Sequence, residues 1–326
     1  MAVTPDVTDA GARLEELVDT AHRIRHAIEA VIEGKSEVVR LTLTVLLAEG
    51  HLLIEDVPGV GKTMLAKALA RSIDCPVKRV QFTPDLLPSD ITGVSAYNQQ
   101  TREFEFKPGP VFANIVVGDE INRASPKTQS ALLECMEEHQ VTVDGVTYQL
   151  ESPFMVIATQ NPIEMEGTYP LPEAQRDRFT AKIAMGYPEP AAELEMLDVH
   201  GASQPLDKME AVATTAEVQS LIEAVRAVYA SQPVKRYAVD VVAATRHSPD
   251  LRLGASPRAT LHLLRSARAH AALSGRDYVI PDDLQELAVP VLAHRLLPSL
   301  EAQGQRRQPE QVIADLVRRV PVPDTR

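Results

Sequence analysis

Apolar segments of two kinds alternate along the N-terminal part of the chain. Short, largely apolar runs predict strands at HLLIE (51–55), VKRVQF (77–82), NIVVGDE (114–120) and PFMVIATQNP (153–162). Between the first two runs, apolar residues at Leu65 and every fourth position after it share one face of a predicted helix. Runs that are apolar on both faces and alternate with helices predict an α/β fold, in which helices flank a buried parallel sheet.

Two further helices and two insertions belong to the same region. Apolar residues spaced by three and four predict an amphipathic helix over 14–31, and Ser36 is placed to cap a second helix over 36–48. VSAYNQQTREFEFKPG (94–109) has two β-prone halves around a polar centre, and HQVTVDGVTYQLES (139–152) alternates about an Asp-Gly pair. We therefore expect two β-hairpin insertions in the α/β region.

The pattern becomes helical in the C-terminal part. Thr214 and Glu217 form a predicted capping box, a second helix over 257–273 follows a serine, and 281–297 predicts a third helix or one broken at Pro290. The apolar stripe of the first of these helices comprises Val218, Leu221, Ile222, Val225 and Val228.

A loop-rich stretch separates the two parts. Residues 188–208 contain the prolines and polar residues typical of a domain boundary. A length of 326 residues is enough for two domains. We predict an α/β domain over 1–200 that includes the N-terminal helices and both hairpins, and a smaller all-helical lid over 201–326.

Composition narrows the class of protein. The formal net charge of −12 argues against a protein whose main partner is a nucleic acid backbone. Cys75 and Cys135 are far apart and lack metal-ligand spacing, so we interpret them as buried thiols in a reducing compartment. No apolar run is long enough to span a membrane and the first residues do not have the pattern of a signal peptide, so we expect a cytoplasmic protein.

The first chemical motif lies directly after the first strand. PGVGKT (58–63) supplies glycines that allow close approach of the backbone to phosphate, a lysine for the outer phosphates and a threonine hydroxyl for magnesium. Asp56 stands where the usual pattern has a glycine, and its carboxylate can point away from phosphate or cap a turn. The residues predicted to bind the nucleotide are Pro58, Gly59, Val60, Gly61, Lys62, Thr63 and Met64.

Polar residues at two further strand ends extend this site. Asp119 can hold Mg²⁺ together with Thr63, and the adjacent Glu120 can polarise an attacking water molecule. Asn161, after the next strand, could orient that water or simply form a turn. Acids at the carboxyl end of a parallel strand, downstream of a phosphate loop, favour a catalytic site over a solvated turn.

Arginines later in the chain suggest contacts to phosphate. Arg176 and Arg178 in EAQRDRF could reach the phosphate of a neighbouring subunit, or could be a solvated pair. Arg258 lies in the first turn of a predicted helix, where the helix dipole disfavours a cation, so it hints at an anionic partner. The acidic group Glu134, Glu137 and Glu138 is most simply interpreted as a solvated helix face.

Four stretches together resemble the MoxR family of AAA+ ATPases. They are GHLLIEDVPGVGKTMLAKALA, GPVFANIVVGDEINRASPKTQSALLECMEE, IATQNPIEMEGTYPLPEAQRDRF and GASPRATLHLLRSARAHAALSGRDYVIPDDL. Departures from the family pattern are Asp56, Gly118 within the second stretch, and Arg176 at a position expected to be apolar. The resemblance implies a P-loop fold with hairpin insertions and a helical lid.

The resemblance also implies roles for individual residues. Residues 59–63 would form the Walker A loop, and Asp119 and Glu120 would form Walker B. Asn161 would be sensor one, Arg178 the arginine finger, and Arg258 sensor two, acting on the nucleotide of its own subunit or of a neighbour. Which of the two arginines in EAQRDRF is the finger is left open by the departure at Arg176.

These features predict an ATP hydrolase that needs ATP and Mg²⁺ and remodels or matures client proteins. The resemblance implies a ring, taken to be a hexamer, and partners with von Willebrand factor A domains; the sequence does not identify the client. The alternative is a nucleic-acid motor related to minichromosome-maintenance helicases. Such motors need basic residues on their hairpins, whereas 139–152 contains no lysine or arginine and 94–109 mixes Arg102 and Lys107 with glutamates. We therefore expect no nucleic acid partner.

Overall fold

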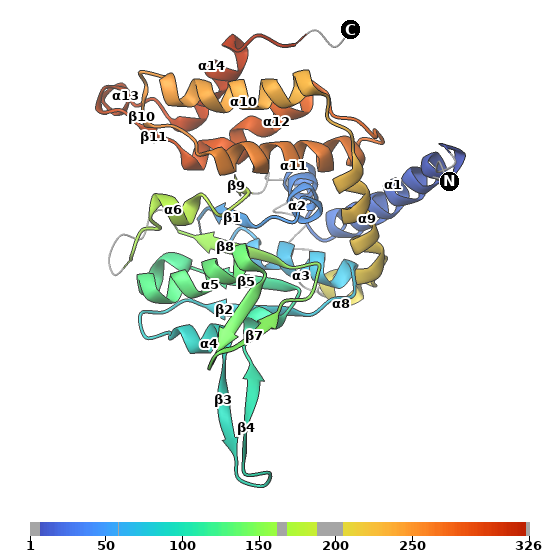
Figure 1. The fold of residues 1–326 in the computed structure, drawn as a ribbon, viewed down its shortest axis with the longest axis vertical. Coiled ribbons are helices and arrows are strands. Elements are labelled where there is room, and N and C mark those ends of the chain that lie inside the picture. Colours follow the sequence, from blue (N-terminus) through green and yellow to red (C-terminus); the bar gives the residue numbers. More distant parts are fainter. Residues whose placement is uncertain (1–6, 58, 162–167, 188–204, 324–326) are drawn as a thin grey trace.

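A five-stranded parallel sheet forms the centre of the α/β region in the computed structural model, which describes residues 7–57, 59–161, 168–187 and 205–323 (Figure 1). The strand order is β2-β5-β8-β1-β9. The strands are β1 Leu52–Glu55, β2 Val77–Gln81, β5 Ile115–Asp119, β8 Met155–Gln160 and β9 Ala181–Ile183. Because every pairing is parallel, the carboxyl ends of all five strands share one edge of the sheet, here called the C-terminal edge. The opposite edge is the N-terminal edge.

Both faces of the inner strands β1, β5 and β8 are buried, as their apolar sequences predict, whereas β2 at the side of the sheet is largely exposed. Successive side chains of a strand point to opposite faces. Leu52 and Ile54 accordingly join an apolar cluster that contains α3, whereas Leu53 joins a second cluster that contains α5. The elements of this region outside the sheet and hairpins are α1 Val7–Glu29, α2 Ser36–Leu47, α3 Lys62–Ser72, α4 Pro88–Thr92, η1 Pro110–Phe112, η2 Ile121–Arg123, α5 Pro126–Glu138 and α6 Glu173–Arg176.

Both predicted hairpin insertions are present. They are formed by β3 Gly93–Asn98 with β4 Glu103–Pro108, and by β6 Gln140–Val143 with β7 Val146–Gln149. At the second turn Asp144 and Gly145 have φ of 51° and 80°, the left-handed values that a two-residue hairpin turn requires. The β3–β4 hairpin projects from the body of the molecule (Figure 1), and Phe106 of β4 stacks on Tyr148 of β7 with ring centroids 4.1 Å apart.

The C-terminal helices form a layer beside the sheet, which we call the lid. Its elements are α8 Pro205–Lys208, α9 Thr215–Ala227, α10 Gln232–His247, β10 Leu251–Leu253, α11 Pro257–Leu273, α12 Pro281–Leu292, η3 Ala293–Arg295, β11 Leu297–Pro298, α13 Leu300–Gly304 and α14 Pro309–Arg319. Thr214 and Glu217 form the predicted capping box, and the predicted apolar stripe of α9 is buried. The short antiparallel ribbon β10–β11 is an addition that the helical pattern did not predict.

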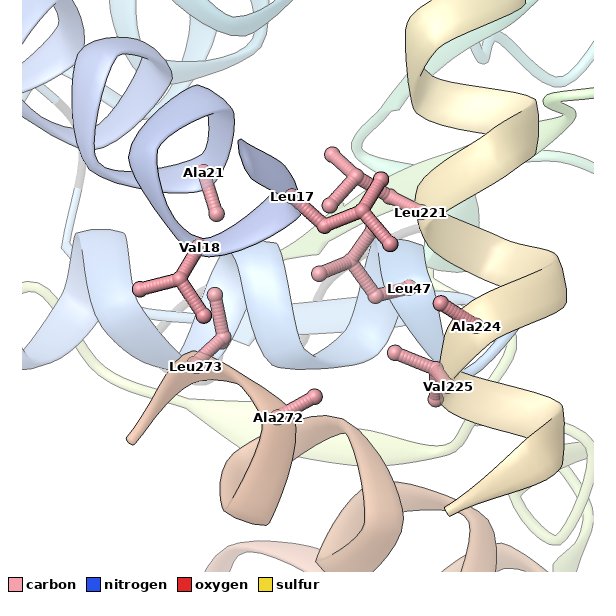
Figure 2. Close-up of a pocket in the computed structure, with 9 residues that line it drawn as sticks. All are labelled: Leu17, Val18, Ala21, Leu47, Leu221, Ala224, Val225, Ala272 and Leu273. Carbon is pink, nitrogen blue, oxygen red and sulfur yellow. The ribbon is translucent and has the colours of Figure 1, made fainter. Parts of the chain in front are cut away.

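An apolar joint connects the lid to the N-terminal helices (Figure 2). Side chains from α1, α2, α9 and α11 converge there without a polar group among them. They are Leu17, Val18, Ala21, Leu47, Leu221, Ala224, Val225, Ala272 and Leu273. One buried apolar cluster runs from β1 and α3 through this region into α11 and α12, so the lid and the α/β region share a continuous core.

Several elements differ from the sequence-based expectations. The sheet has a fifth strand, β9, which was missed because its three residues are too short to show a period. Lys35, not Ser36, is the N-cap of α2, and it makes no side-chain capping bond. The helix α12 continues through Pro290, which lies in its last turn before η3, so it is not broken there. The predicted boundary at 200 lies outside the described residues, and the division into two domains stays a prediction.

The structure bears on two further expectations, the burial of the cysteines and the absence of a membrane span. Cys135 is buried, as predicted, whereas Cys75 is only half-buried, and both are free. Burial raises the pKa of each thiol to about 12, which makes both unreactive. Among the helices in the described ranges, none combines the length and the apolar character that a membrane span requires.

Candidate active site

The loop between β1 and α3 has the backbone of a phosphate-binding loop. Gly59 and Gly61 have φ of 86° and 88°, in the left-handed region that favours glycine. Gly61 is the N-cap of α3 and no side chain caps this helix, so its first N–H groups are free to bind an anion. Val60 and Met64 are half-buried and pack against the core, while Pro58 lies outside the described residues.

Lys62 is directed along this loop. Its Nζ donates to the main-chain oxygen of Asp56 at 2.6 Å. Burial lowers the pKa of Lys62, and the attraction of Asp56, Asp119 and Glu120 opposes that shift, so the ammonium group lies within electrostatic range of all three acids. Thr63 follows in the first turn of α3 and is half-buried. The loop therefore offers amides, a cation and a hydroxyl group to a phosphate.

Asp56, at the position of the expected glycine, has both carboxylate oxygens bonded to main-chain N–H groups. Oδ2 accepts from the N–H of Gly186 at 2.6 Å, and Oδ1 accepts from the N–H of Val57 at 2.8 Å. Both oxygens are thus occupied by main-chain donors, as predicted for a carboxylate that caps a turn. The departure from the glycine pattern is compatible with phosphate binding.

Two acids lie at the C-terminal edge, Asp119 as the last residue of β5 and Glu120 directly after it. Oδ1 of Asp119 accepts from the hydroxyl of Thr159 at 2.5 Å, and the same hydroxyl accepts from the N–H of Glu120 at 2.9 Å. Arg79 Nε donates to Asp119 Oδ2 at 3.1 Å, and Gln81 Nε2 donates to Glu120 Oε2 at 2.8 Å. Side chains of β2 and β8 therefore hold both acids, and sequence reasoning missed these supports, although Thr159 stands only two residues before the predicted Asn161.

Asn161 and Gly118 complete this edge. Asn161 directly follows β8, which pairs with both β1 and β5, and it is 6% exposed. It therefore lies at the same edge as the glycine loop and the acids, where its position was predicted. Gly118 packs tightly within β5: a Cβ there would lie 3.2 Å from Phe82 Cε2, so close packing accounts for this departure from the apolar pattern.

The predicted arginines lie at the N-terminal edge, opposite the glycine loop. Arg178 precedes β9, and its Nε lies 3.2 Å from Oε2 of Glu137. Arg258, in the first turn of α11, pairs with Oε1 of the same carboxylate. The two arginines border one cavity of about 190 Å³. Its lining also contains Glu49, Gly50, His51, Met136, His139, Thr180, Leu261, His262 and Arg265.

This arrangement distinguishes the two arginines of EAQRDRF. Arg176 lies 4.0 Å from Glu173 and does not line the cavity, and within the described chain its buried Nε has no hydrogen-bond partner. Arg178 instead shares Glu137 with Arg258. Glu137 was interpreted as part of a solvated helix face, and the residue is exposed. The interpretation missed its ion pairs, because α5 ends at the N-terminal edge and brings this side chain between the arginines.

The residues at the C-terminal edge fit a nucleotide with Mg²⁺. An uncapped helix N-terminus and Lys62 suit a triphosphate, and Thr63 and Asp119 supply the one or two protein ligands that Mg²⁺ usually takes beside phosphate and water. In the described ranges no cluster of three or more His, Cys, Asp or Glu could hold a metal on its own. The fold, the glycine loop, the strand-end acids and the lid together define a P-loop ATPase of the AAA+ class.

Comparison with known proteins agrees with this class. Residues 51–181 match the family model described as "ATPase family associated with various cellular activities (AAA)", and residues 243–316 match an AAA lid domain. The chain is 53% identical to YeaC of Bacillus subtilis over 91% of this chain and 92% of that one, and 43% identical to Chaperone MoxR1 of Mycobacterium tuberculosis over 94% and 83%. It is 31% identical to Protein MoxR of Methylorubrum extorquens over 95% and 96%. The chain belongs to the MoxR family of AAA+ ATPases.

A solved structure supports the same assignment. A Cytophaga hutchinsonii protein assigned as an ATPase superposes with a TM-score of 0.91 at 37% identity, over 98% of this chain and 99% of that one. The protein is an ATP hydrolase, as predicted. The alternative of a nucleic-acid motor is not favoured, because the relatives are MoxR proteins and the β6–β7 hairpin carries no basic residue.

Proposed function

We propose that the chain hydrolyses ATP at sites shared between adjacent copies in a ring and uses the cycle to remodel client proteins. The observation that supports this is the separation of the two halves of the site. Lys62 and Asp119 lie at the C-terminal edge, whereas Arg178 and Arg258 lie at the N-terminal edge beside Glu137. The four residues of β1 separate these edges by about 13 Å. Each pair of arginines therefore serves the phosphates of the next copy.

Within one copy, the residues at the C-terminal edge bind the nucleotide with Mg²⁺ and activate the attacking water. The loop 58–64 would hold the triphosphate through main-chain amides and Lys62, and Thr63 and Asp119 would hold Mg²⁺, which spreads positive charge over the phosphate oxygens. Glu120 polarises the attacking water, with Gln81 fixing one of its carboxylate oxygens. Asn161 orients the same water from the end of β8.

Between copies, Arg178 acts as the arginine finger and Arg258 as sensor two, both in trans. Their common bond to Glu137 supports a joint role, since one carboxylate holds both guanidinium groups at a single cavity. Contacts that join one edge of a copy to the opposite edge of the next are head-to-tail, and such contacts form a ring when the rotation between successive copies closes. We propose a hexamer.

The chaperone-like role rests on relatives. One is named Chaperone MoxR1, and it covers most of this chain. Partners with von Willebrand factor A domains and a cytoplasmic location are part of the proposal, and follow from the resemblance to the family. The client is a protein substrate that the ring engages during ATP turnover.

Dilution tests the shared site. ATPase activity per chain should fall when the protein is diluted below the concentration at which rings assemble, because a separated copy lacks the arginines of its neighbour. Turnover that stays constant far below that threshold would falsify the shared-site mechanism. Sedimentation at the same concentrations locates the threshold independently of activity.

A trapped ring tests the remodelling role. Glu120→Gln should bind ATP without hydrolysing it and hold its partner, so a pull-down with ATP should capture a protein that is released when nucleotide is removed. Lys62→Ala is the matched control, since it should bind no ATP and capture nothing. Equal capture by both variants would contradict ATP-dependent engagement.

A further inference from the structure

The segment 177–179, which carries Arg178, is held by residues of the lid. The carboxylate of Asp177 accepts from the hydroxyl of Ser256, at 3.0 Å for Oδ1 and 2.8 Å for Oδ2. Arg295 Nη1 donates to Oδ1 at 2.7 Å. The main-chain oxygen of Phe179 accepts from Arg295 Nη2 at 2.5 Å. The lid therefore contacts the segment on both sides of Arg178.

Arg295 is the centre of this contact and is itself fixed. Its side chain is 1% exposed, and its Nε donates to the main-chain oxygen of Val291 at 2.9 Å. Nη2 lies 3.0 Å from Nδ1 of His262, whose pKa falls to about 2 chiefly through burial, so this neutral ring can accept. Burial also lowers the pKa of Arg295, to about 10, so the guanidinium stays charged at neutral pH with Asp177 as its carboxylate partner.

The same contact reaches Arg258. Ser256 is the N-cap of α11, and Arg258 is the second residue of that helix. The hydroxyl of Ser256, which donates to Asp177, also accepts from the N–H of Ala259 at 3.4 Å. Asp177 thus directly precedes Arg178 in the chain, and it is connected to Arg258 through its bond to Ser256 at the start of α11. Glu137 joins the same two arginines at their guanidinium ends.

We infer that Asp177 is a positioning residue for the shared site: its bonds to Ser256 and Arg295 tie Arg178 and Arg258 into one unit that moves with the lid. The inference rests on the proposed function, because it gives the two arginines a common task at the nucleotide of a neighbour. Asp177 itself touches no phosphate. The position of the lid in one copy thereby sets how well the phosphates in the next copy are contacted.

Two substitutions of the same residue test this role. Asp177→Asn keeps the size and one acceptor oxygen but removes the charge beside Arg295, and Asp177→Glu keeps the charge but displaces it by one methylene. Both should lower kcat about tenfold, because arginines that are slightly misplaced contribute less to the transition state. The Kd for an ATP analogue should stay within about twofold, because the nucleotide loop of the same copy is intact. Glu173→Gln removes a carboxylate of α6 that is 52% exposed and lies 4.0 Å from Arg176, and should turn over at the parent rate.

Mixed rings separate positioning in trans from mere loss of fold. Lys62→Ala copies have an inactive nucleotide site but an intact Asp177. When the two variants are mixed in equal amounts, about a quarter of the interfaces join the working nucleotide site of an Asp177→Asn copy to the intact arginines of a Lys62→Ala copy. The mixture should therefore recover about a quarter of the parent rate. Each variant alone should stay at or below about a tenth. A folding defect in Asp177→Asn would not be relieved this way, and Asp177→Glu serves for the same test if Asp177→Asn melts early.

A parallel mixture distinguishes failure of this inference from failure of the proposed function. Arg178→Ala should also be restored by Lys62→Ala. If Arg178→Ala is restored and the Asp177 variants are not, Asp177 only stabilises its own chain and the inference is wrong. Parent-level kcat in both Asp177 variants would overturn it as well. If no mixture is restored, the sharing of sites between copies is itself wrong.

Discussion

The two edges of the central sheet carry opposite chemistry and are held in different ways. At the C-terminal edge, Asp119 and Glu120 face a loop of main-chain amides that follows β1 directly. At the N-terminal edge, Arg178 and Arg258 meet at Glu137 through contacts between elements far apart in the chain. The acidic edge has the phosphate loop but lacks the arginines, and the basic edge has the arginines but lacks a phosphate loop, so neither edge alone makes a complete ATPase site. Under the proposed function, each copy therefore supplies one half to each of two different sites.

The manner of holding also differs. The phosphate edge depends on backbone geometry, since left-handed glycines and an uncapped helix make its donors. The arginine edge depends on ion pairs and buried imidazoles, which require charges in particular protonation states. The first edge should therefore tolerate changes of pH and salt that weaken the second.

The largest expected effect is on turnover. Lys62→Ala and Arg178→Ala should each lower kcat by about 10³-fold or more, since both remove positive charge from the transferred phosphoryl group. Only Lys62→Ala should abolish ATP binding by the same copy, because Arg178 lies at the other edge. Measuring the binding of a fluorescent ATP analogue together with kcat for both variants checks that only Lys62→Ala loses ATP binding.

Arg176→Ala is the matched control for the finger. It removes a neighbouring arginine that does not line the cavity, and should reduce kcat much less than Arg178→Ala. If Arg176→Ala were the more damaging of the two, the finger would have to be reassigned. If Arg178→Ala also lost ATP binding, the separation of the edges would be wrong.

The next largest effect is on stability in acid. Burial lowers the pKa of His51 to about 4, that of His262 to about 2, and that of His294 well below its ordinary value. All three stay neutral when folded, whereas the unfolded chain takes up protons below about pH 6.5, so their contribution is present above that pH and is lost as the pH falls. Each histidine should cost about 1 kcal/mol of the free energy of unfolding between pH 6.5 and 5.5.

Denaturant unfolding at pH 7.5, 6.5 and 5.5 measures this loss. His294→Gln can still donate to the main-chain oxygen of Phe179 but cannot be protonated, so it should reduce the dependence on pH by about a third. His26→Gln changes a histidine on α1 whose side chain is 76% exposed, and should leave the dependence unchanged. Equal slopes for the two variants would show that the buried rings at the arginine edge do not control acid stability.

A smaller effect is expected at the carboxylate between the arginines. Glu137→Gln keeps the shape but removes the charge that holds Arg178 and Arg258 together. Because these side chains are about one-third exposed, screening limits the loss, and kcat should fall about fivefold with no change in ATP binding. The difference from the parent should shrink as salt is raised. Glu138→Gln, one residue along the same helix, should have no effect, and a gain in kcat for Glu137→Gln would mean that this carboxylate competes with phosphate.

The sequence predicted the phosphate edge much better than the arginine edge, for a physical reason. The glycine loop, the acids and Asn161 each follow a strand directly, and the carboxyl ends of parallel strands meet at one edge, so local pattern and topology were enough. The same reasoning predicted the hairpin at Asp144, where turn chemistry is local.

Pairs of residues that lie far apart in the chain were not predicted from the sequence. Thr159 supports Asp119 across 40 positions of the chain, Glu137 meets Arg258 across 121, and Asp177 meets Arg295 across 118. No periodicity in the sequence encodes which charged residues of distant elements face one another. Arg258 was found because a cation is unusual in the first turn of a helix and because the family resemblance included its segment, whereas its partner Glu137 was taken for a solvated residue.

The smallest effect is expected at Asp56, the acid of the phosphate edge that replaces the usual glycine. Asp56→Asn keeps one oxygen to accept from a main-chain N–H but loses the second acceptor, so the free energy of unfolding should fall by about 1 kcal/mol. It also removes a negative charge near Lys62, so the Kd for ATP should fall about twofold to threefold. Asp74→Asn is the control, since it removes the same charge beyond the far end of α3, about 16 Å away, and should leave the Kd unchanged. Weaker ATP binding by Asp56→Asn would mean that the carboxylate shapes the loop for phosphate, and the phosphate edge would then depend on a charge as the arginine edge does.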